Sequence, residues 1–342
     1  MLAAAQISSF IFFLSIATFH SLSRATPTNS TDPILYEILP FIRVYRNGTI
    51  QRFIGQDYAP PSPITPDPGG VLSKDVNVSE KLGLSARIYL PPRKPHRSGK
   101  LPLVIYYHGG GFVTESAFSP SYHRHLSLLA ARAGVLALSV NYRLAPENPL
   151  PAAYEDSWLA LKWSLNSTEP WLAKFADFRR VYLGGDSAGA NIAHHMAIRV
   201  GSEDPGFKIS GMFLNCPYFL GKRAIGNESA YPYLKTQMQK LWIYAYPNNG
   251  LGLDNPLVNP DKDPNLAKLG CGRVAVFVAG NDGLRFRGRN YVASLEKSGW
   301  KGKVKVVEFK GEDHVFNLGK PDSPNALLML KLLAYFLNGR WI

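Results

Sequence analysis

The chain has 342 residues, of which 46% are hydrophobic, and it carries a formal net charge of +13 at pH 7. This length and apolar content allow a large buried core, which excludes a disordered chain and favours a single α/β domain with insertions. The basic stretches at 93–97 and 285–289 are not interleaved with aromatic residues in a nucleic-acid-binding pattern, so we expect a solvated surface and no nucleic-acid partner.

The N-terminal segment has the pattern of a secretory signal. Met1 to Ser23 contains no charged side chain and is strongly apolar from Phe10 to Phe19. Ser23-Arg24-Ala25 then offers a small-x-small cleavage site, so we expect residues 1–25 to be removed as a signal peptide on the way to the secretory pathway or the cell exterior. The cleaved chain would not insert stably into a membrane. A membrane anchor and a wrongly assigned first exon, which would leave the protein in the cytoplasm, are the alternatives.

Five N-glycosylation sequons are present, at Asn29, Asn47, Asn77, Asn166 and Asn227. Roughly two would arise by chance, so their number favours the secretory route and a glycoprotein. Cys216 and Cys271 each adjoin an apolar run, and we expect buried free thiols. No Cys/His metal spacing and no phosphate-binding glycine loop occurs, so we expect neither a metal nor a cofactor.

Apolar runs typical of buried strands alternate with helical patterns along residues 26–342. The expected strands are 86–90, 103–107, 135–140, 180–184, 209–215, 274–279 and 304–309. The expected helices lie near 120–133, 150–165, 188–200, 287–298 and 323–338. This alternation predicts a mostly parallel central sheet with helices on both faces, the α/β class. The proline-rich stretches 59–70 and 91–100 are expected to be loops.

A glycine-rich segment, His108-Gly109-Gly110-Gly111-Phe112, directly follows the strand expected at 103–107. Three glycines leave the backbone N–H groups uncovered by side chains. Gly110 and Gly111, together with Ala188, are therefore expected to form an oxyanion hole, in which N–H groups donate to the negative oxygen of an acyl-transfer intermediate. A flexible glycine turn is the alternative.

Residues 181–191 predict a strand, a Gly-x-Ser-x-Gly turn and a helix, the pattern of the nucleophile elbow of an α/β-hydrolase. Ser187 is the candidate nucleophile. Glycines are needed at 185 and 189 because the sharp turn brings the backbone against neighbouring elements, where side chains would clash.

The fold places a catalytic acid and then a histidine downstream of the serine. Asp282 follows the strand expected at 274–279, and His314 follows the last expected strand. We therefore expect a catalytic triad in which His314 deprotonates Ser187 and Asp282 orients His314. Glu312 and Asp313 are interpreted as loop residues. The remaining histidines considered are interpreted as packing or surface residues: His123, His125, His194 and His195.

At these residues the chain resembles the plant carboxylesterase family, in the hormone-sensitive-lipase-like group of α/β-hydrolases. The stretches that carry the resemblance are 36–41, 108–112, 141–147, 151–156 and 185–191. The resemblance extends from about Asp32 to the C-terminus and implies one α/β-hydrolase domain with a cap. The cap would come from the N-terminal segment, 33–68, and from the insertion at 217–260. One departure is visible: the family's Asp-x-Leu-x-Asp is here Asp282-Gly283-Leu284-Arg285-Phe286, which leaves the structure of that loop in doubt.

The resemblance implies a serine carboxylesterase that hydrolyses a carboxylic ester of a plant specialised metabolite or hormone conjugate through an acyl-enzyme at Ser187. The aromatic residues within 217–260 suit a pocket for a bulky, partly apolar small molecule. Two other functions stay open. A gibberellin-receptor-like binding protein would lack the triad histidine, so His314 argues against it. A lyase or cyclase of the hydroxyisoflavanone dehydratase-like type often carries threonine at the nucleophile, so Ser187 argues against that.

Overall fold

The computed structural model describes residues 32–92 and 99–342. The signal peptide expected at 1–25 and the sequon at Asn29 lie outside the described residues. The sequon asparagines inside them are all exposed, as a glycan requires: Asn47, Asn77, Asn166 and Asn227. Secretion and glycosylation stay predictions. Among the helices of the described ranges, none combines the length and the hydropathy of a membrane span.

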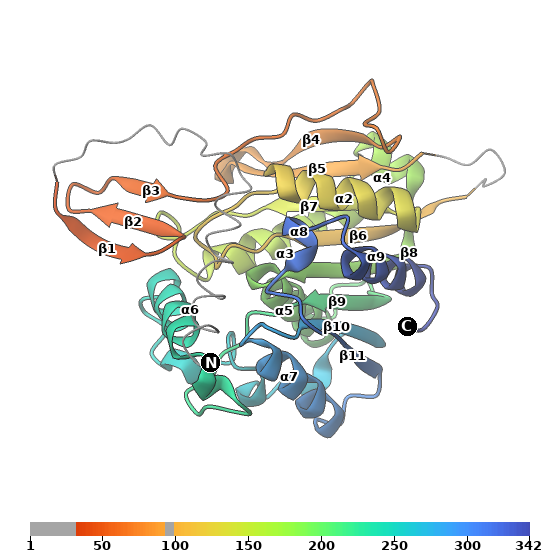
Figure 1. Ribbon diagram of the computed structural model, residues 1–342. Helices are drawn as coiled ribbons and strands as arrows, with labels where there is room; N and C mark the ends of the chain where they lie inside the picture. Colours follow the sequence, from red (N-terminus) through yellow and green to blue (C-terminus); the bar gives the residue numbers. More distant parts are fainter. Residues whose placement is uncertain (1–31, 93–98) are drawn as a thin grey trace.

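An eight-stranded sheet, in the order β11-β10-β9-β8-β6-β7-β5-β4, forms the centre of the molecule (Figure 1). Its strands are β4 (Leu72–Ser79), β5 (Leu84–Leu90), β6 (Leu101–Tyr107), β7 (Leu136–Asn141), β8 (Ala176–Asp186), β9 (Gly211–Asn215), β10 (Arg273–Ala279) and β11 (Lys303–Phe309). Strands β6 to β11 run parallel, whereas β5 is antiparallel to both β4 and β7. The expected mostly parallel sheet is confirmed. The expected strands are all present, and the edge strand β4 is additional.

Helices cover both faces of this sheet because its central strands are apolar on both sides. In β6, Leu103, Ile105 and Tyr107 face one core, and Val104 and Tyr106 face the other. The first core is covered by α3 (Ala152–Asn166), α5 (Ala188–Glu203) and α7 (Arg285–Lys297); the second is covered by α2 (Pro120–Ala133) and α9 (Pro324–Leu337). All five helices were expected. The short α4 (Pro170–Phe175) and α8 (Phe316–Gly319) were not.

A cap lies beside the carboxyl ends of the parallel strands (Figure 1). It consists of a separate antiparallel sheet, β1 (Ile34–Ile38), β2 (Ile42–Tyr45) and β3 (Ile50–Arg52), and of helix α6 (Pro232–Ala245). Helix α6 packs against β1, where the rings of Tyr36 and Tyr244 stack with centroids 4.3 Å apart. The two segments expected to supply a cap therefore meet each other. Short 3-10 helices occupy the connections: η1 (Glu80–Leu82), η2 (Glu228–Ala230), η3 (Gly252–Asp254), η4 (Pro260–Lys262) and η5 (Leu266–Lys268).

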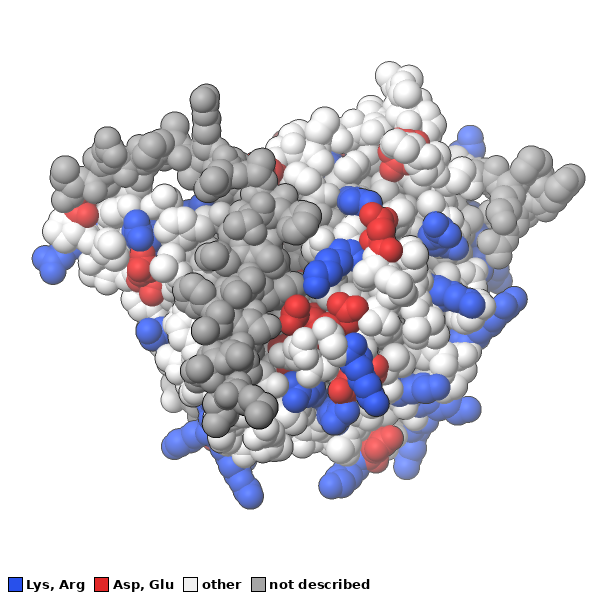
Figure 2. Space-filling view, in the orientation of Figure 1, with Lys and Arg blue, Asp and Glu red and all other residues white. Residues whose placement is uncertain are grey.

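Charged side chains are spread over the surface. On the described part of the face in Figure 2, Lys and Arg are interspersed with Asp and Glu and do not gather into one basic patch. This distribution agrees with the solvated surface expected from the sequence; the absence of a nucleic-acid partner stays a prediction.

Candidate active site

The turn between β8 and α5 holds Ser187 in a rare backbone conformation. Ser187 has φ 50° and ψ −118°, a combination that persists only where the surroundings enforce it. Its N–H donates to Asn215 of β9 at 2.9 Å, and its carbonyl accepts from Tyr218 N–H at 3.0 Å. A Cβ at Gly189 would collide with the carbonyl oxygen of Tyr107, so the helix can approach β6 only with glycine there. The sharp turn expected around Ser187 is present.

His314 and Asp282 form a hydrogen-bonded pair beside this turn. Asp282 follows β10 and is 3% exposed. Its Oδ2 lies 2.7 Å from His314 Nδ1, so we assign the ring proton to Nδ1, which leaves Nε2 free to accept a proton. Burial lowers the pKa of an imidazole, but the charge and hydrogen bond of Asp282 outweigh burial and raise the pKa of His314 well above its usual value.

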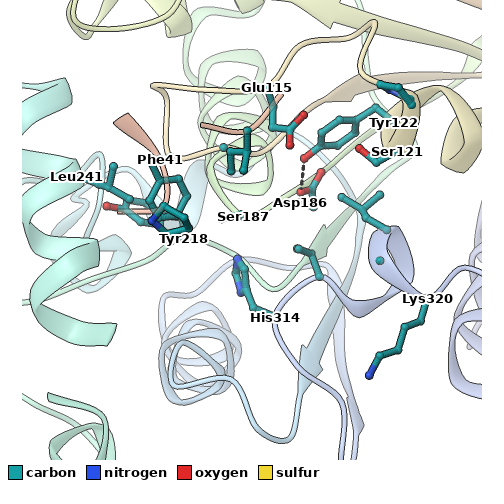
Figure 3. A pocket seen from close by; sticks show the side chains of 18 of the residues that line it. Phe41, Glu115, Ser121, Tyr122, Asp186, Ser187, Tyr218, Leu241, His314 and Lys320 are labelled. Atoms are coloured by element: carbon teal, nitrogen blue, oxygen red, sulfur yellow. Dashed lines mark hydrogen bonds between the residues drawn. The ribbon is translucent and has the colours of Figure 1, made fainter. Parts of the chain in front are cut away.

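Ser187 and His314 line the same cavity (Figure 3). No hydrogen bond joins their side chains in the described structure. Such bonds are often long without substrate and tighten when one binds. The structure thus brings together the three residues expected to form the triad, and their catalytic roles stay predictions. Asp313, the competing acid, accepts a hydrogen bond from Asn281 at the surface.

The loop after β6 lines this cavity with two glycines. Gly110 and Gly111 line it and have φ values of 94° and 62°, which favour glycine. The Gly110 carbonyl accepts from Val113 and Thr114 at 3.1 Å, which closes a tight turn. In the described part of the chain, the N–H groups of Gly110, Gly111 and Ala188 donate to no protein acceptor. They have no protein acceptor to compete with a substrate oxygen, and their role as oxyanion donors stays a prediction.

A tyrosine that the sequence did not single out connects the oxyanion loop to the nucleophile turn. The Tyr122 hydroxyl accepts from Gly109 N–H at 2.7 Å and donates to Asp186 Oδ2 at 2.8 Å (Figure 3). Tyr106 donates to Asp186 Oδ1 at 2.7 Å. Burial raises the pKa of Asp186 to about 6, although both tyrosine hydrogen bonds favour the charged carboxylate. Asp186 precedes Ser187, so this network ties together the two loops expected to perform catalysis.

The cavity has a volume of about 350 Å³ and a largely apolar wall on the side of the cap. Phe41, Ile54, Tyr218, Met238 and Leu241 form that wall. Phe41 and Leu241 come from the two cap segments, and they lie on one side of Ser187 in Figure 3. The opposite side, between α2 and α8, is mixed: Ser121, Arg124 and Lys320 lie there beside apolar residues such as Val315 and Leu318. The cap therefore closes an apolar chamber over the candidate nucleophile.

Comparisons with known proteins agree with this geometry. A family model described as alpha/beta hydrolase fold matches residues 104–318. A 2-hydroxyisoflavanone dehydratase from Glycyrrhiza echinata is 44% identical, over 92% of this chain and 100% of the relative. Probable carboxylesterase 1 from Arabidopsis thaliana is 48% identical, over 89% of this chain and 98% of the relative. The chain belongs to the plant carboxylesterase family of α/β-hydrolases. The solved structure of a hyperthermophilic esterase from the archaeon Pyrobaculum calidifontis is also similar, with a TM-score of 0.66 and 27% identity over 78% of this chain and 84% of the other.

The departure from the plant carboxylesterase pattern after Asp282 is accommodated locally. Asp282 Oδ1 accepts from Leu284 N–H at 2.9 Å, so the same carboxylate that holds His314 also closes the turn into α7. Phe286 stands where the family pattern has its second carboxylate, and its ring centroid lies 6.5 Å from that of Tyr231 in the cap. The preceding Arg285 donates to the Tyr231 hydroxyl at 3.0 Å and to the Asp282 carbonyl. The doubt about this loop is resolved: it remains ordered without the second carboxylate.

Two groups of side chains within the described residues have the composition of a metal site. One is Cys216, Asp282 and His314. Burial raises the pKa of the Cys216 thiol, so that thiol stays protonated, and the other two residues already bind each other. This group is better suited to proton transfer than to holding a metal. Both cysteines are buried and free, as expected.

Proposed function

We propose that this plant carboxylesterase-family protein is a serine esterase that hydrolyses an apolar carboxylic ester through an acyl-enzyme at Ser187. The observation that carries the proposal is the pair of Asp282 and His314, joined at 2.7 Å beside a cavity that Ser187 also lines. The carboxylesterase and esterase names of several relatives and solved structures support the same activity.

The positions of these groups support the following reaction. His314 Nε2 accepts the Ser187 proton as the hydroxyl oxygen attacks the ester carbonyl, and Asp282 stabilises the resulting imidazolium. The new oxyanion accepts from Gly110, Gly111 and Ala188, each donor contributing about 3 kcal/mol to the transition state. His314 then protonates the leaving alcohol. Water attacks the acyl-enzyme by the same route and releases the acid.

The cavity supports a substrate with one bulky apolar part and one polar part. The cap wall of Phe41, Met238 and Leu241 would hold the apolar group, and the side near Arg124 and Lys320 would face the polar group. An ester of a plant specialised metabolite or a hormone conjugate has this character.

The test is a series of p-nitrophenyl esters with acyl chains of increasing length, combined with a fluorophosphonate label. We expect ester hydrolysis, and one phosphonyl group on the peptide that contains Ser187. Ser121→Ala serves as the control, since Ser121 lines the same cavity. A label on another residue, or hydrolysis that survives complete labelling of Ser187, would contradict the acyl-enzyme.

Dehydration is a second candidate because two 2-hydroxyisoflavanone dehydratases are 44% and 43% identical to the chain. Elimination would use His314 as a base and the loop N–H groups to stabilise an enolate, without an acyl-enzyme. Incubation with a 2-hydroxyisoflavanone and mass detection of water loss decides between them. Dehydration that persists in Ser187→Ala while ester hydrolysis is lost would favour the lyase.

A further inference from the structure

A second group of potential metal ligands lies outside the active-site cavity. His194 and His195 belong to α5, and Asp263 directly follows η4. One nitrogen of each imidazole and one carboxylate oxygen lie within 4.8 Å of one another. Ligand atoms at 2.0–2.2 Å from a tetrahedral ion stand about 3.4 Å apart, so small side-chain movements would bring all three onto one ion.

His194 has a ring nitrogen without a partner. The side chain is 0% exposed, and its Nδ1 lies 3.1 Å from the Tyr291 hydroxyl. Its Nε2 is buried and makes no hydrogen bond within the described residues. Buried polar atoms are nearly always satisfied, because leaving one unpaired costs about 1–3 kcal/mol. When Nδ1 donates to the Tyr291 hydroxyl, Nε2 keeps its lone pair, and this buried nitrogen is available to a ligand.

A backbone hydrogen bond fixes the tautomer of His195. Its Nε2 lies 2.9 Å from the Leu257 carbonyl, which can only accept, so Nε2 carries the hydrogen and Nδ1 keeps its lone pair. A carbonyl bonded to the outer nitrogen is the usual support of a metal-binding histidine.

Asp263 supplies a negative charge that no protein cation balances. Its Oδ1 accepts from Asn265 N–H at 2.8 Å, and among the described residues no Lys or Arg forms an ion pair with it. The residue is partly exposed, which gives an ion and a water molecule access from solvent.

We propose that His194, His195 and Asp263 bind one divalent transition-metal ion of the Zn²⁺ type, with water as the fourth ligand. Two neutral imidazoles and one carboxylate suit Zn²⁺. The ion would join α5, the helix that starts directly after Ser187, to the connection between α6 and β10. Its role is structural and independent of the proposed esterase reaction. The sequence did not predict it because the two histidines are adjacent and the aspartate is remote.

The experiment uses the full chain, purified without a polyhistidine tag, stripped with EDTA and titrated with ZnCl₂. We expect about one tightly bound zinc per chain by elemental analysis and a rise in Tm of about 5 °C at saturating zinc. Co²⁺ in place of Zn²⁺ should give the absorption bands of a four-coordinate site. Asp263→Asn should remove binding and the Tm rise. Asp261→Asn is the matched control, since Asp261 lies on the same turn but contacts Asn290 and Ser294.

The result that overturns the proposal is a stripped protein that takes up less than about a tenth of an equivalent of zinc, or an Asp263→Asn variant that binds zinc as the parent does. Asp263 is partly exposed, so its variant is expected to fold even if variants of the buried histidines do not. Ester turnover measured with and without zinc separates this proposal from the esterase, because we expect kcat to change less than twofold.

Discussion

The floor of the active-site cavity, which consists of the turns that carry Gly110, Gly111 and Ser187, is stabilised differently from the cap. On the floor, backbone packs on backbone: Gly189 lies against the Tyr107 carbonyl, and Ser187 is hydrogen-bonded to the neighbouring strand. In the cap, side chains make the contacts and apolar groups remain exposed, with Leu35 at 64% and Ile243 at 51%. We infer that packed backbone fixes the positions of the reacting groups on the floor, whereas the cap can change shape with the substrate.

Removing the nucleophile should have the largest effect. Ser187→Ala is expected to lower kcat on any ester by about 10⁴ to 10⁶, and His314→Ala nearly as much, because the two act as a unit. The double variant should lose little more. Steady-state kinetics with a p-nitrophenyl ester measures this. If Ser187→Ala kept more than a tenth of the parent's turnover, Ser187 would not be the nucleophile and the floor would not be the reacting region.

Neutralising the candidate acid, Asp282, should have the next largest effect on kcat. Asp282→Asn is expected to slow kcat by about 10⁴, since an amide can neither stabilise the imidazolium nor enforce the same tautomer. Asp313→Asn is the matched control and should change kcat less than threefold, because its carboxylate faces Asn281 and not His314. A larger loss for Asp313→Asn than for Asp282→Asn would reverse the ranking of the two acids.

The sequence predicts the floor far better than the cap. Continuous apolar strands such as 103–107 and 274–279 stand out because they are buried on both faces, and the residues that follow them lie at one edge of the sheet. The strands β1 to β3 are only three to five residues long, and most side chains of β1 and β3 are at least partly exposed, so their pattern does not separate them from loops. Length and periodicity therefore found the helices and strands that carry the candidate triad.

Contacts between segments that are distant in the chain could not be predicted from the sequence. Nothing in the residues around Tyr122 indicates that its hydroxyl bonds to both Gly109 and Asp186, since all three come from different elements. The grouping of His194 and His195 with Asp263 was missed for the same reason, and the two histidines were interpreted as packing or surface residues. Both are buried.

Tyr122→Phe tests whether a side-chain hydroxyl also helps to position the oxyanion loop on the floor of the cavity. The change leaves Gly109 N–H and one oxygen of Asp186 without their partner, and an unpaired buried polar group costs about 1–3 kcal/mol. Because this cost falls on the oxyanion loop and the nucleophile turn, we expect kcat to fall about 10-fold to 100-fold, with KM little changed. Tyr89→Phe is the control: Tyr89 is buried in the same core, and its hydroxyl contacts His123 and Arg87 instead of the oxyanion loop. Equal effects of the two variants on kcat would show that Tyr122 stabilises the fold and does not position the oxyanion loop.

The pH dependence of kcat/KM should report the Asp282–His314 pair. Only neutral His314 can accept the Ser187 proton, so activity should fall tenfold per unit as the pH drops below the pKa of His314. Because Asp282 raises that pKa, the acidic limb should lie above the ordinary value of about 6.5. In Asp282→Asn the limb should move to lower pH. A limb that stays in place in that variant would mean that another group controls it.

The smallest effect should come from the cap. Leu241 lines the cavity beside Gly111, so Leu241→Ala should enlarge the apolar chamber. We expect kcat/KM to fall about threefold for short acyl chains and to rise by a similar factor for chains a few carbons longer, because each buried methylene contributes about 0.8 kcal/mol. Ile243→Ala, on the exposed side of the same helix, is the control and should leave the preference unchanged. If Leu241→Ala instead lowered kcat equally for every chain length, the cap would share the floor's rigidity, and the contrast between the two regions would fail.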